Sequence, residues 1–326
     1  MRSFAWLTRC VGVLLGALMC DSSRADPSTL APEQSYDRGD LPTARALGMG
    51  GAQNALGVST TGLFYNPANL PFARVFHIEA FGGWIPEARR GTYGGAIVDS
   101  VLNSFGLSAG FAGSYSHFDA DGMDRRWTDL RTALALPLGE HFALGVTGRY
   151  LRVLQPIGRG PLGNSLVSGG SADAALFNNV TLDAGMTIAV IPELRIGVVG
   201  HNLTTPGTSL APTTLATGIG YGARTFSVEA GSLVDFTTFQ KPVTRVMAGG
   251  EYFFVEHVVV RAGYRYEHGW RTHSASLGGG YIDRKWSIEL GAQRDLAGDL
   301  KATQMVLSLR YFYDAVQGGN NEPDGY

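Results

Sequence analysis

Three carboxylates stand close together at Asp119, Asp121 and Asp124, a spacing that suggests oxygen ligands for a hard cation. An EF-hand loop supplies its calcium ligands at fixed positions, with a glycine at the sixth and a bidentate glutamate at the twelfth. This stretch has neither the glycine in that place nor the glutamate. We therefore predict a solvated loop and no metal site, with weak bridging of calcium or lipopolysaccharide as the alternative.

Nucleophilic and phosphate-binding chemistry also lacks its usual motifs. None of the histidines lies in an H-E-x-x-H motif, and the sequence contains no G-x-S-x-G motif. The run from Gly48 to Gly51 is not followed by Lys-Ser or Lys-Thr, so it does not predict a phosphate loop. His201 and His273 could meet a serine and an acid in space, which keeps a barrel hydrolase as an alternative. We predict that the protein is not an enzyme and uses no cofactor.

The N-terminus has the pattern of a secretory signal peptide. Arg2 and Arg9 flank or precede the apolar run 11–19, and Ser23-Arg24-Ala25 forms a small-x-small cleavage site. We expect cleavage after residue 25, which would remove both cysteines; lipidation at Cys20 is the alternative. The rest of the chain has no apolar run near the ~20 residues that a membrane-spanning helix requires.

The composition favours short strands joined by turns. The 326 residues include 45 glycines, and only 17% are charged. The formal net charge of −2 gives no indication of a nucleic-acid partner.

Apolar and polar residues alternate from about residue 74 to residue 314. In the stretch 258–267, for example, Val258, Val260 and Tyr264 share one face, while Arg261 and Arg265 share the other. We count about fourteen such strands, an even number as in closed bacterial barrels. The predicted ranges are 74–85, 91–100, 104–117, 125–136, 141–154, 176–190, 193–203, 212–222, 225–236, 242–253, 256–267, 272–282, 285–295 and 303–314.

The connections between these strands alternate in length. Tight turns at 137–140, 191–192, 222–224, 255 and 283–284 alternate with longer polar segments such as 155–175. Aromatic residues flank the tight turns, in the pairs Tyr221 and Phe226, Tyr252 and Phe253, and Tyr281 and Trp286. Short periplasmic turns, longer external loops and aromatic girdles are typical of outer-membrane barrels. We predict an all-β, transmembrane antiparallel barrel in a Gram-negative outer membrane, with a soluble β-sandwich as the alternative.

This location predicts two kinds of partner: outer-membrane lipid with lipopolysaccharide, and the barrel assembly machinery. The same alternation directs charged side chains into the barrel, because an arginine on the lipid face at mid-depth costs ~2–4 kcal/mol. The residues expected to face inward are Arg149, Asp183, Glu229, Arg245, Glu251, Arg261, Arg265, Glu289 and Arg310.

Residues 41–73 do not alternate. The stretch from Ala44 to Leu56 suggests a short apolar helix interrupted by glycines. In Asn66-Pro67-Ala68, asparagine is a good N-cap and proline suits the first helical position, so this step predicts a fixed corner followed by a helical turn. We expect a compact plug inside the barrel mouth.

The segment ARALGMGGAQNALGVSTTGLFYNPANL resembles the N-terminal segment of FadL-type outer-membrane channels and of the related PorV/PorQ-type barrels. The matching residues are Ala44, Arg45, Leu47, Gly48, Met49, Gly50, Gly51, Ala52, Asn66, Pro67, Ala68 and Leu70. The resemblance implies a barrel of fourteen strands with an N-terminal hatch. For FadL-type channels it implies passive uptake of long-chain fatty acids or other hydrophobic compounds through a gated path. For PorV/PorQ-type barrels it implies a role in protein secretion or surface attachment.

The resulting organisation is a signal peptide at 1–25, a hatch segment at 26–73, a barrel at 74–314 and a polar tail at 315–326. Two features depart from the FadL pattern, because the external loops are short and the interior is rich in charge. A lateral opening would require a kinked strand, for which Gly106, Gly110 and Gly113 are the candidates, since glycine weakens or bends strands.

Overall fold

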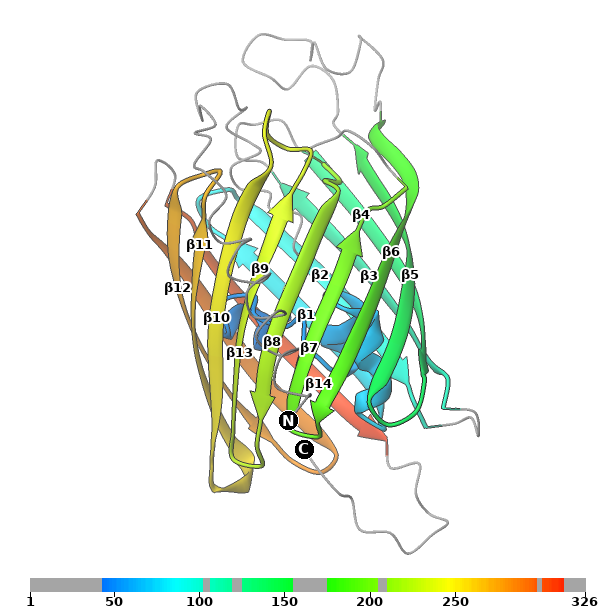
Figure 1. Cartoon of the computed structure of the whole chain (residues 1–326). Helices are drawn as coiled ribbons and strands as arrows, with labels where there is room; N and C mark the ends of the chain where they lie inside the picture. Colours follow the sequence, from blue (N-terminus) through cyan, green and yellow to red (C-terminus); the bar gives the residue numbers. More distant parts are fainter. Residues whose placement is uncertain are drawn as a thin grey trace, which may run out of the picture.

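The structure, a computed structural model, describes residues 43–101, 106–118, 125–154, 175–204, 210–297 and 301–313. Its main feature is a closed antiparallel β-barrel (Figure 1). The strands are β1 (Phe76–Ile85), β2 (Arg90–Asp99), β3 (Ser108–Phe118), β4 (Arg125–Pro137), β5 (Phe142–Leu154), β6 (Ala175–Ile191), β7 (Leu194–His201), β8 (Thr214–Gly222), β9 (Phe226–Asp235), β10 (Val243–Phe254), β11 (Val258–Glu267), β12 (Thr272–Ile282), β13 (Trp286–Ala297) and β14 (Thr303–Tyr313).

Each strand pairs with its neighbours in the chain, and β1 pairs with β14 to close the barrel. The predicted barrel of fourteen strands is therefore confirmed. The largest difference at a strand end is in β3, which was expected to start at residue 104 but starts at Ser108. Gly106 has a φ of 72°, a left-handed conformation that does not continue a strand ladder.

The two ends of the barrel differ. One end, called here the tight-turn end, holds the start of β1, the end of β14 and the short connections 192–193, 223–225, 255–257 and 283–285. The opposite end, the long-loop end, holds the intervals 119–124, 155–174, 202–213 and 236–242. Outer-membrane barrels have their short turns on the periplasmic side, so the same arrangement is expected here.

The outer face of the wall is apolar. Leu277 is 69% exposed, Val180 59% and Leu290 54%, although all three lie within strands. A continuous band of this kind is unsuited to contact with water and marks a surface that meets another apolar phase. The predicted alternation thus has its apolar face outward.

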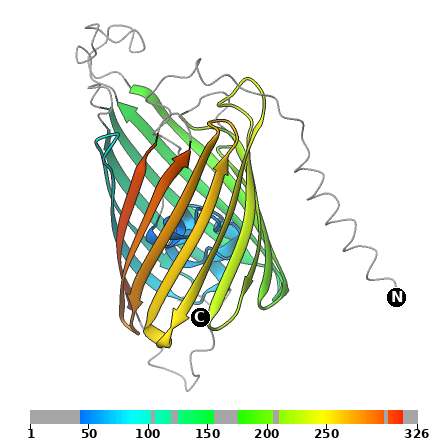
Figure 2. The ribbon, with the colours of Figure 1, turned by 90° about the vertical axis from the view of Figure 1, so that its left-hand side faces the viewer.

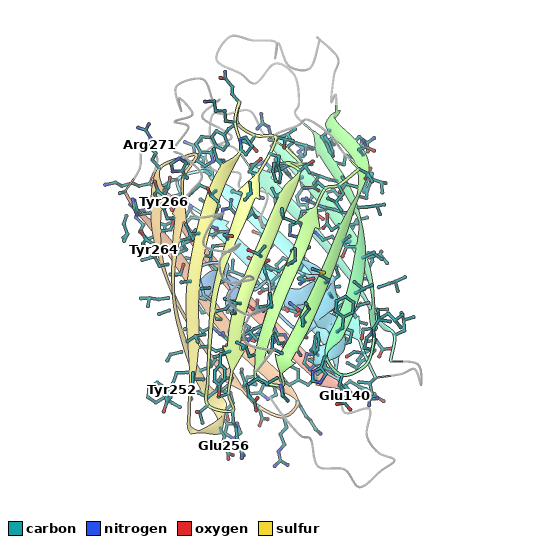
Figure 3. All side chains as sticks on the ribbon, in the orientation of Figure 1. Glu140, Tyr252, Glu256, Tyr264, Tyr266 and Arg271 are labelled. Carbon is teal, nitrogen blue, oxygen red and sulfur yellow. The ribbon has the colours of Figure 1, made fainter. Side chains whose placement is uncertain are left out.

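Aromatic side chains line the outer face at the tight-turn end, as predicted. The ring centroids of Tyr221 and Phe226 are 5.9 Å apart, and those of Tyr281 and Trp286 are 5.4 Å apart. One expected member was wrong, because alternation turns Phe253 inward and makes Phe254 the outward neighbour of Tyr252 at 4.8 Å. Tyr252 points away from the wall near this end in Figure 3, while Tyr264 and Tyr266 lie toward the opposite end.

Within the described residues, no helix has the length and apolar character needed to cross a bilayer.

Residues 43–73, called here the interior segment, lie inside the barrel near mid-height rather than at its mouth (Figure 2). They contain α3 (Ala44–Gly48), η2 (Ser59–Leu63) and η3 (Pro67–Phe72). The helix expected from Ala44 to Leu56 is shorter than predicted and ends at Gly48. Gly50 and Gly51 follow with φ values of 67° and 85°, and this left-handed backbone cannot continue a right-handed helix.

Candidate functional site

The interior segment lies directly against glycines of the wall. A Cβ atom added at Gly145, Gly185, Gly197, Gly263 or Gly291 would come closer than 3.0 Å to atoms of this segment. Many of these inward glycines face one another across neighbouring strands. The cross-strand pairs are Gly145 with Gly185, Gly197 with Gly218, Gly218 with Gly231, Gly249 with Gly263, and Gly278 with Gly291. The wall is therefore shaped at this level to accept a polypeptide backbone.

An arginine of the interior segment makes a bidentate ion pair with the wall. Arg45 Nη2 lies 2.6 Å from Glu251 Oε1, and Arg45 Nε lies 3.2 Å from Glu251 Oε2. Burial alone would lower the pKa of Arg45, but the charge of Glu251 outweighs it and the pKa of Arg45 is raised. Fork-to-fork geometry of this kind adds both strength and directional specificity.

The pair continues as a chain of alternating charges along the wall. Arg261 binds Glu251 at 3.0 Å and Glu289 at 2.7 Å, and Arg310 binds Glu289 at 3.3 Å. Arg310 also binds Glu79 at 3.2 Å, and Glu79 accepts a hydrogen bond from the Thr60 hydroxyl. This ion-pair chain runs from Arg45 through Glu251, Arg261, Glu289 and Arg310 to Glu79. It begins on the interior segment, and its last member, Glu79 of β1, is bonded to Thr60 of the same segment.

The ion-pair chain contains three arginines and three glutamates, so its charges balance. Glu79 and Glu289 are each 1% exposed and Arg261 is 4% exposed. Buried charges are tolerated when they are paired and hydrogen-bonded, and the loss of one partner is strongly destabilising. The wall members of the ion-pair chain come from β10, β11, β13, β14 and β1. The ion-pair chain therefore also links the first and last strands, where the barrel closes.

A second wall carboxylate binds the backbone of the interior segment. Glu229 Oε1 accepts the N–H of Ala55 at 2.9 Å, and Glu229 Oε2 accepts the N–H of Leu56 at 2.8 Å. Glu229 is 3% exposed. These two bonds fix the turn that follows the glycine-rich part of the segment.

The Asn66-Pro67-Ala68 step forms the predicted corner and helical turn. Asn66 has an extended backbone with φ −143° and ψ 107°, and its Oδ1 accepts the Ala68 N–H at 3.1 Å. Its Nδ2 donates to the carbonyl of Asn54 at 2.9 Å and to Thr187 Oγ1 at 3.0 Å. One asparagine therefore caps the turn, joins two parts of the interior segment and binds strand β6.

The opposite side of the interior segment is apolar. Leu63, Phe64 and Leu70 form one buried cluster with Phe81 and Val98 of β1 and β2. Phe64 and Phe81 make an edge-to-face contact with ring centroids 5.8 Å apart. The interior segment thus has a charged and backbone-bonded interface toward β6–β14. Its interface toward β1–β4 is built around the apolar cluster and also contains the contacts of Ser59 with His77 and of Thr60 with Glu79.

The glycines considered for a lateral kink do not interrupt the wall. The ladders of β3 with β2 and β4 run without a register shift across Gly110 and Gly113, and Gly106 lies before the strand. A Cβ at Gly110 would overlap Leu63, so this glycine allows the apolar side of the interior segment to approach the wall. Backbone pairing therefore continues on both sides of β3 at Gly110 and Gly113, and a lateral opening at these glycines stays a prediction.

The nine predicted inward charges all lie on the inner face, but they have different partners. Glu229 and Glu251 bind the interior segment directly, and Arg261, Glu289 and Arg310 belong to the ion-pair chain. The other four bind wall residues: Arg149 with Asp129, Asp183 with His201, Arg245 with Glu267, and Arg265 with Gln293.

Sequence reasoning did not single out Glu79, Asp129 or Arg131, although all three lie on inward faces. Glu79 shares the inward face of β1 with Phe81, a mixture that weakens the alternation signal. Arg131 donates from Nη1 to the carbonyl of Phe64 at 3.3 Å and lies over its ring at 5.2 Å.

Among the described residues, the two histidines considered for a hydrolase lie apart. His201 lies on the inner face beside Asp183 at 3.2 Å, whereas His273 lies on β12 beside the partly exposed Tyr264, 2.5 Å from its hydroxyl, so the two cannot share a triad. In the part of the chain that the structure describes, no three of His, Cys, Asp and Glu gather as a metal site. The predicted calcium-like loop at Asp119–Asp124, the signal peptide and the tail 315–326 lie outside the described residues.

No known protein family and no curated protein matches the chain by sequence. The fold is similar to that of the CymD monoaromatic hydrocarbon channel, with 15% identity, a TM-score of 0.63, and coverage of 82% of this chain and 96% of that one. It is also similar to the toluene transporter TbuX of Ralstonia pickettii, with 15% identity, a TM-score of 0.60, and coverage of 84% and 99%. A FadL homologue of Pseudomonas aeruginosa gives 14% identity, a TM-score of 0.58, and coverage of 84% and 99%. These similarities confirm the predicted fold.

Proposed function

We propose that this chain, which has the fold of the FadL-type channels, is an outer-membrane channel for the passive uptake of hydrophobic small molecules. In this proposal residues 26–73 form a hatch, of which the interior segment is the described part. The observation that carries the proposal is the difference between the two interfaces of the interior segment. The apolar outer wall and the long-loop asymmetry of the barrel support the location.

The charged interface resists displacement. Displacement of this side would leave Glu229 and Glu251 without their partners from the interior segment. Breaking a buried ion pair by removal of one partner costs about 3–5 kcal/mol. We therefore propose that this side stays in contact with the wall during transport.

The apolar interface can be exchanged at lower cost. A hydrophobic molecule that enters between Phe64 and Phe81 replaces apolar contacts with contacts of its own, and no ion pair is broken. We propose that the path runs between the interior segment and strands β1–β4. The charged interior, a departure from the FadL pattern, then serves to hold the hatch.

Arg195 bears on the finer identity of the substrate. It lies at the start of β7, with Cζ 4.7 Å from the centre of the Phe72 ring, and it makes no ion pair with any described residue. A guanidinium group without a carboxylate partner can bind the carboxylate of a fatty acid. We propose that hydrophobic acids such as long-chain fatty acids are among the substrates, beside neutral hydrocarbons of the kind named for the similar channels.

A reversible crosslink tests the path. In a host that lacks its own fatty-acid channel, the pair Leu63→Cys and Gly110→Cys would tie the apolar side of the interior segment to β3, where the two positions are in contact. We expect uptake of labelled oleate and toluene to stop on oxidation and to return on reduction. The control pair Gly48→Cys and Gly278→Cys ties the opposite side to β12, where Gly278 Cα lies 3.1 Å from the Cβ position of residue 48. Oxidation of the control should leave uptake unchanged.

Equal inhibition by both crosslinks would contradict the proposed path. Absence of uptake by the folded wild-type barrel would contradict transport itself, and would favour the secretion or surface-attachment function of PorV/PorQ-type barrels. Heat-modifiable mobility on gels would establish that each variant has folded.

A further inference from the structure

Three exposed cations occupy one part of the rim at the tight-turn end. Arg284 and Lys285 lie in the turn between β12 and β13, and Arg74 lies just before β1. The Lys285 carbonyl accepts the N–H of Phe312 on β14 at 2.9 Å, and β14 in turn pairs with β1. The three cations therefore follow the closure of the barrel, from β13 to β1 across two strand spacings of ~5 Å each.

The three cations outnumber the carboxylates beside them. None of the three makes an ion pair with any described residue. Among the described residues, the carboxylates on the outer side of this part of the rim are Asp283, in the same turn, and Asp99 of β2, which accepts the N–H of Val101 at 2.9 Å. Glu79 and Glu289, which belong to the same strands as the cations, are buried on the inner face. The rim therefore has an excess of positive charge where the barrel closes.

Aromatic side chains cover the outer face of the wall next to these cations. The ring centroids of Tyr281 and Trp286 are 5.4 Å apart, and Trp286 is directly opposite Tyr311 of β14. Together with Tyr313, these side chains are between 41% and 57% exposed. We use the name seam patch for the three cations and the four aromatic residues, namely Arg74, Arg284, Lys285, Tyr281, Trp286, Tyr311 and Tyr313.

The β8–β9 hairpin repeats part of this arrangement without the cluster of cations. Residues 221–231 read YGARTFSVEAG and residues 281–291 read YIDRKWSIELG, with tyrosine, arginine, serine, glutamate and glycine in the same places. Arg224 lies in the β8–β9 turn beside the same kind of outward aromatic pair. The residue after it is a threonine rather than a second cation, and the adjacent turns carry the carboxylates of Glu193 and Glu256. This hairpin therefore shows what a single arginine beside two aromatic rings can bind.

A ligand that fits the seam patch has anionic oxygens at the rim and alkyl chains along the wall. Beyond the aromatic residues, toward mid-height, the outer face of β13 and β14 exposes Ile288, Leu290 and Leu309. Tyrosine and tryptophan prefer the headgroup level of a membrane, and the long side chains of arginine and lysine extend past it toward water. A phospholipid whose headgroup has no cation of its own has this form.

We propose that the seam patch binds the headgroup of an anionic phospholipid of the periplasmic leaflet, with its acyl chains against Ile288, Leu290 and Leu309. Guanidinium and ammonium groups donate charge-assisted hydrogen bonds to phosphate. The lipid would cover the outer side of the closure between the first and last strands. The inference rests on the proposed location in the outer membrane, with the tight-turn end on the periplasmic side. It does not depend on what the channel transports.

The test measures binding of phosphatidylglycerol and of phosphatidylethanolamine with the same acyl chains to purified full-length protein in detergent, by native mass spectrometry. The wild-type protein should prefer phosphatidylglycerol. The triple variant Arg74→Gln, Arg284→Gln and Lys285→Gln should bind it about tenfold or more weakly, because each basic residue beside an anionic lipid contributes roughly fivefold. Arg224→Gln is the matched control, and it should bind like the wild type. Glycerol 1-phosphate, which has the phosphate but no acyl chains, should not displace the lipid.

Four results would overturn the proposal. They are unchanged binding by the triple variant, equal loss in Arg224→Gln, equal affinity of the wild type for the two phospholipids, and displacement of the lipid by glycerol 1-phosphate. Heat-modifiable mobility establishes that each variant has folded.

Uptake of oleate and toluene distinguishes this inference from the proposed transport. A wild-type protein that prefers phosphatidylglycerol but transports nothing would refute transport alone. One that transports without this preference would refute the seam patch alone.

Discussion

Replacement of Glu251 by glutamine is the most informative perturbation of the interior segment. Glutamine preserves the size of the side chain but removes its charge and turns an N–H group toward two guanidinium groups. Glu251 accepts from Arg45 at 2.6 and 3.2 Å and from Arg261 at 3.0 Å. We expect Glu251→Gln to loosen residues 44–56 while the barrel itself remains folded.

The expected size of the effect comes from the contacts that remain. Arg261 keeps its ion pair with Glu289 at 2.7 Å, whereas Arg45 keeps a contact with the Leu56 carbonyl at 3.4 Å. Most of the cost therefore falls on Arg45. The side chain of Arg45 is 14% exposed and that of Glu251 is 6% exposed, so we take the lower end of the range for a broken buried pair, about 3 kcal/mol. That free energy raises the population with a detached segment by about 150-fold.

Hydrogen exchange of the purified barrel measures this population directly. Amides of residues 44–56 should exchange about 150-fold faster in Glu251→Gln, and ion conductance in planar bilayers should rise with them. Glu267→Gln is the control, because Glu267 is buried on the same inner face but pairs with Arg245 of the wall. Wild-type exchange in Glu251→Gln, or an equal increase in Glu267→Gln, would refute the role of the ion-pair chain in holding the segment.

Three further predictions concern single positions. Gly145→Ala should disrupt docking of the interior segment against β5, because the added Cβ would overlap Pro67 and Ala68. Gly148→Ala on the same strand is the control, since its Cβ would meet nothing within 4 Å, and it should be neutral. Protease sensitivity of the interior segment compares the two variants. Asn66→Ala should increase ion leakage more than Pro67→Ala, because it removes the helix cap and two donated hydrogen bonds. Loss of the cap alone destabilises the corner by ~1–2 kcal/mol, whereas loss of the proline destabilises it by ~0.4–1 kcal/mol. The reverse order of conductance in planar bilayers would contradict this role of Asn66. Arg195→Gln should lower uptake of oleate several-fold and leave methyl oleate unchanged, and equal loss of both would show that Arg195 only supports Phe72.

Much of the wall followed from local pattern. Alternation with a period of two predicted each of the strands and the face that carries Arg261, Glu289 and Arg310, because successive side chains of a strand point to opposite sides. The Asn-Pro step predicted its own cap and turn, since both depend on neighbouring residues alone. The predicted start of β3 and the predicted length of the helix after Ala44 were wrong, because alternation does not apply there. Left-handed glycines set both limits, Gly106 before β3 and Gly50 with Gly51 after the helix.

The contacts inside the barrel depended on the tertiary structure. From the sequence, Arg45 was part of a motif and Glu251 one of several inward charges, and nothing local could pair residues that are 206 positions apart. The inward glycines looked like ordinary strand glycines until the closed barrel brought the interior segment against them. Sequence determined which face each side chain would occupy, because that choice is set by the backbone of a single strand. Which charges meet, and which glycines must stay small, was decided only by closure of the barrel around its own N-terminal segment.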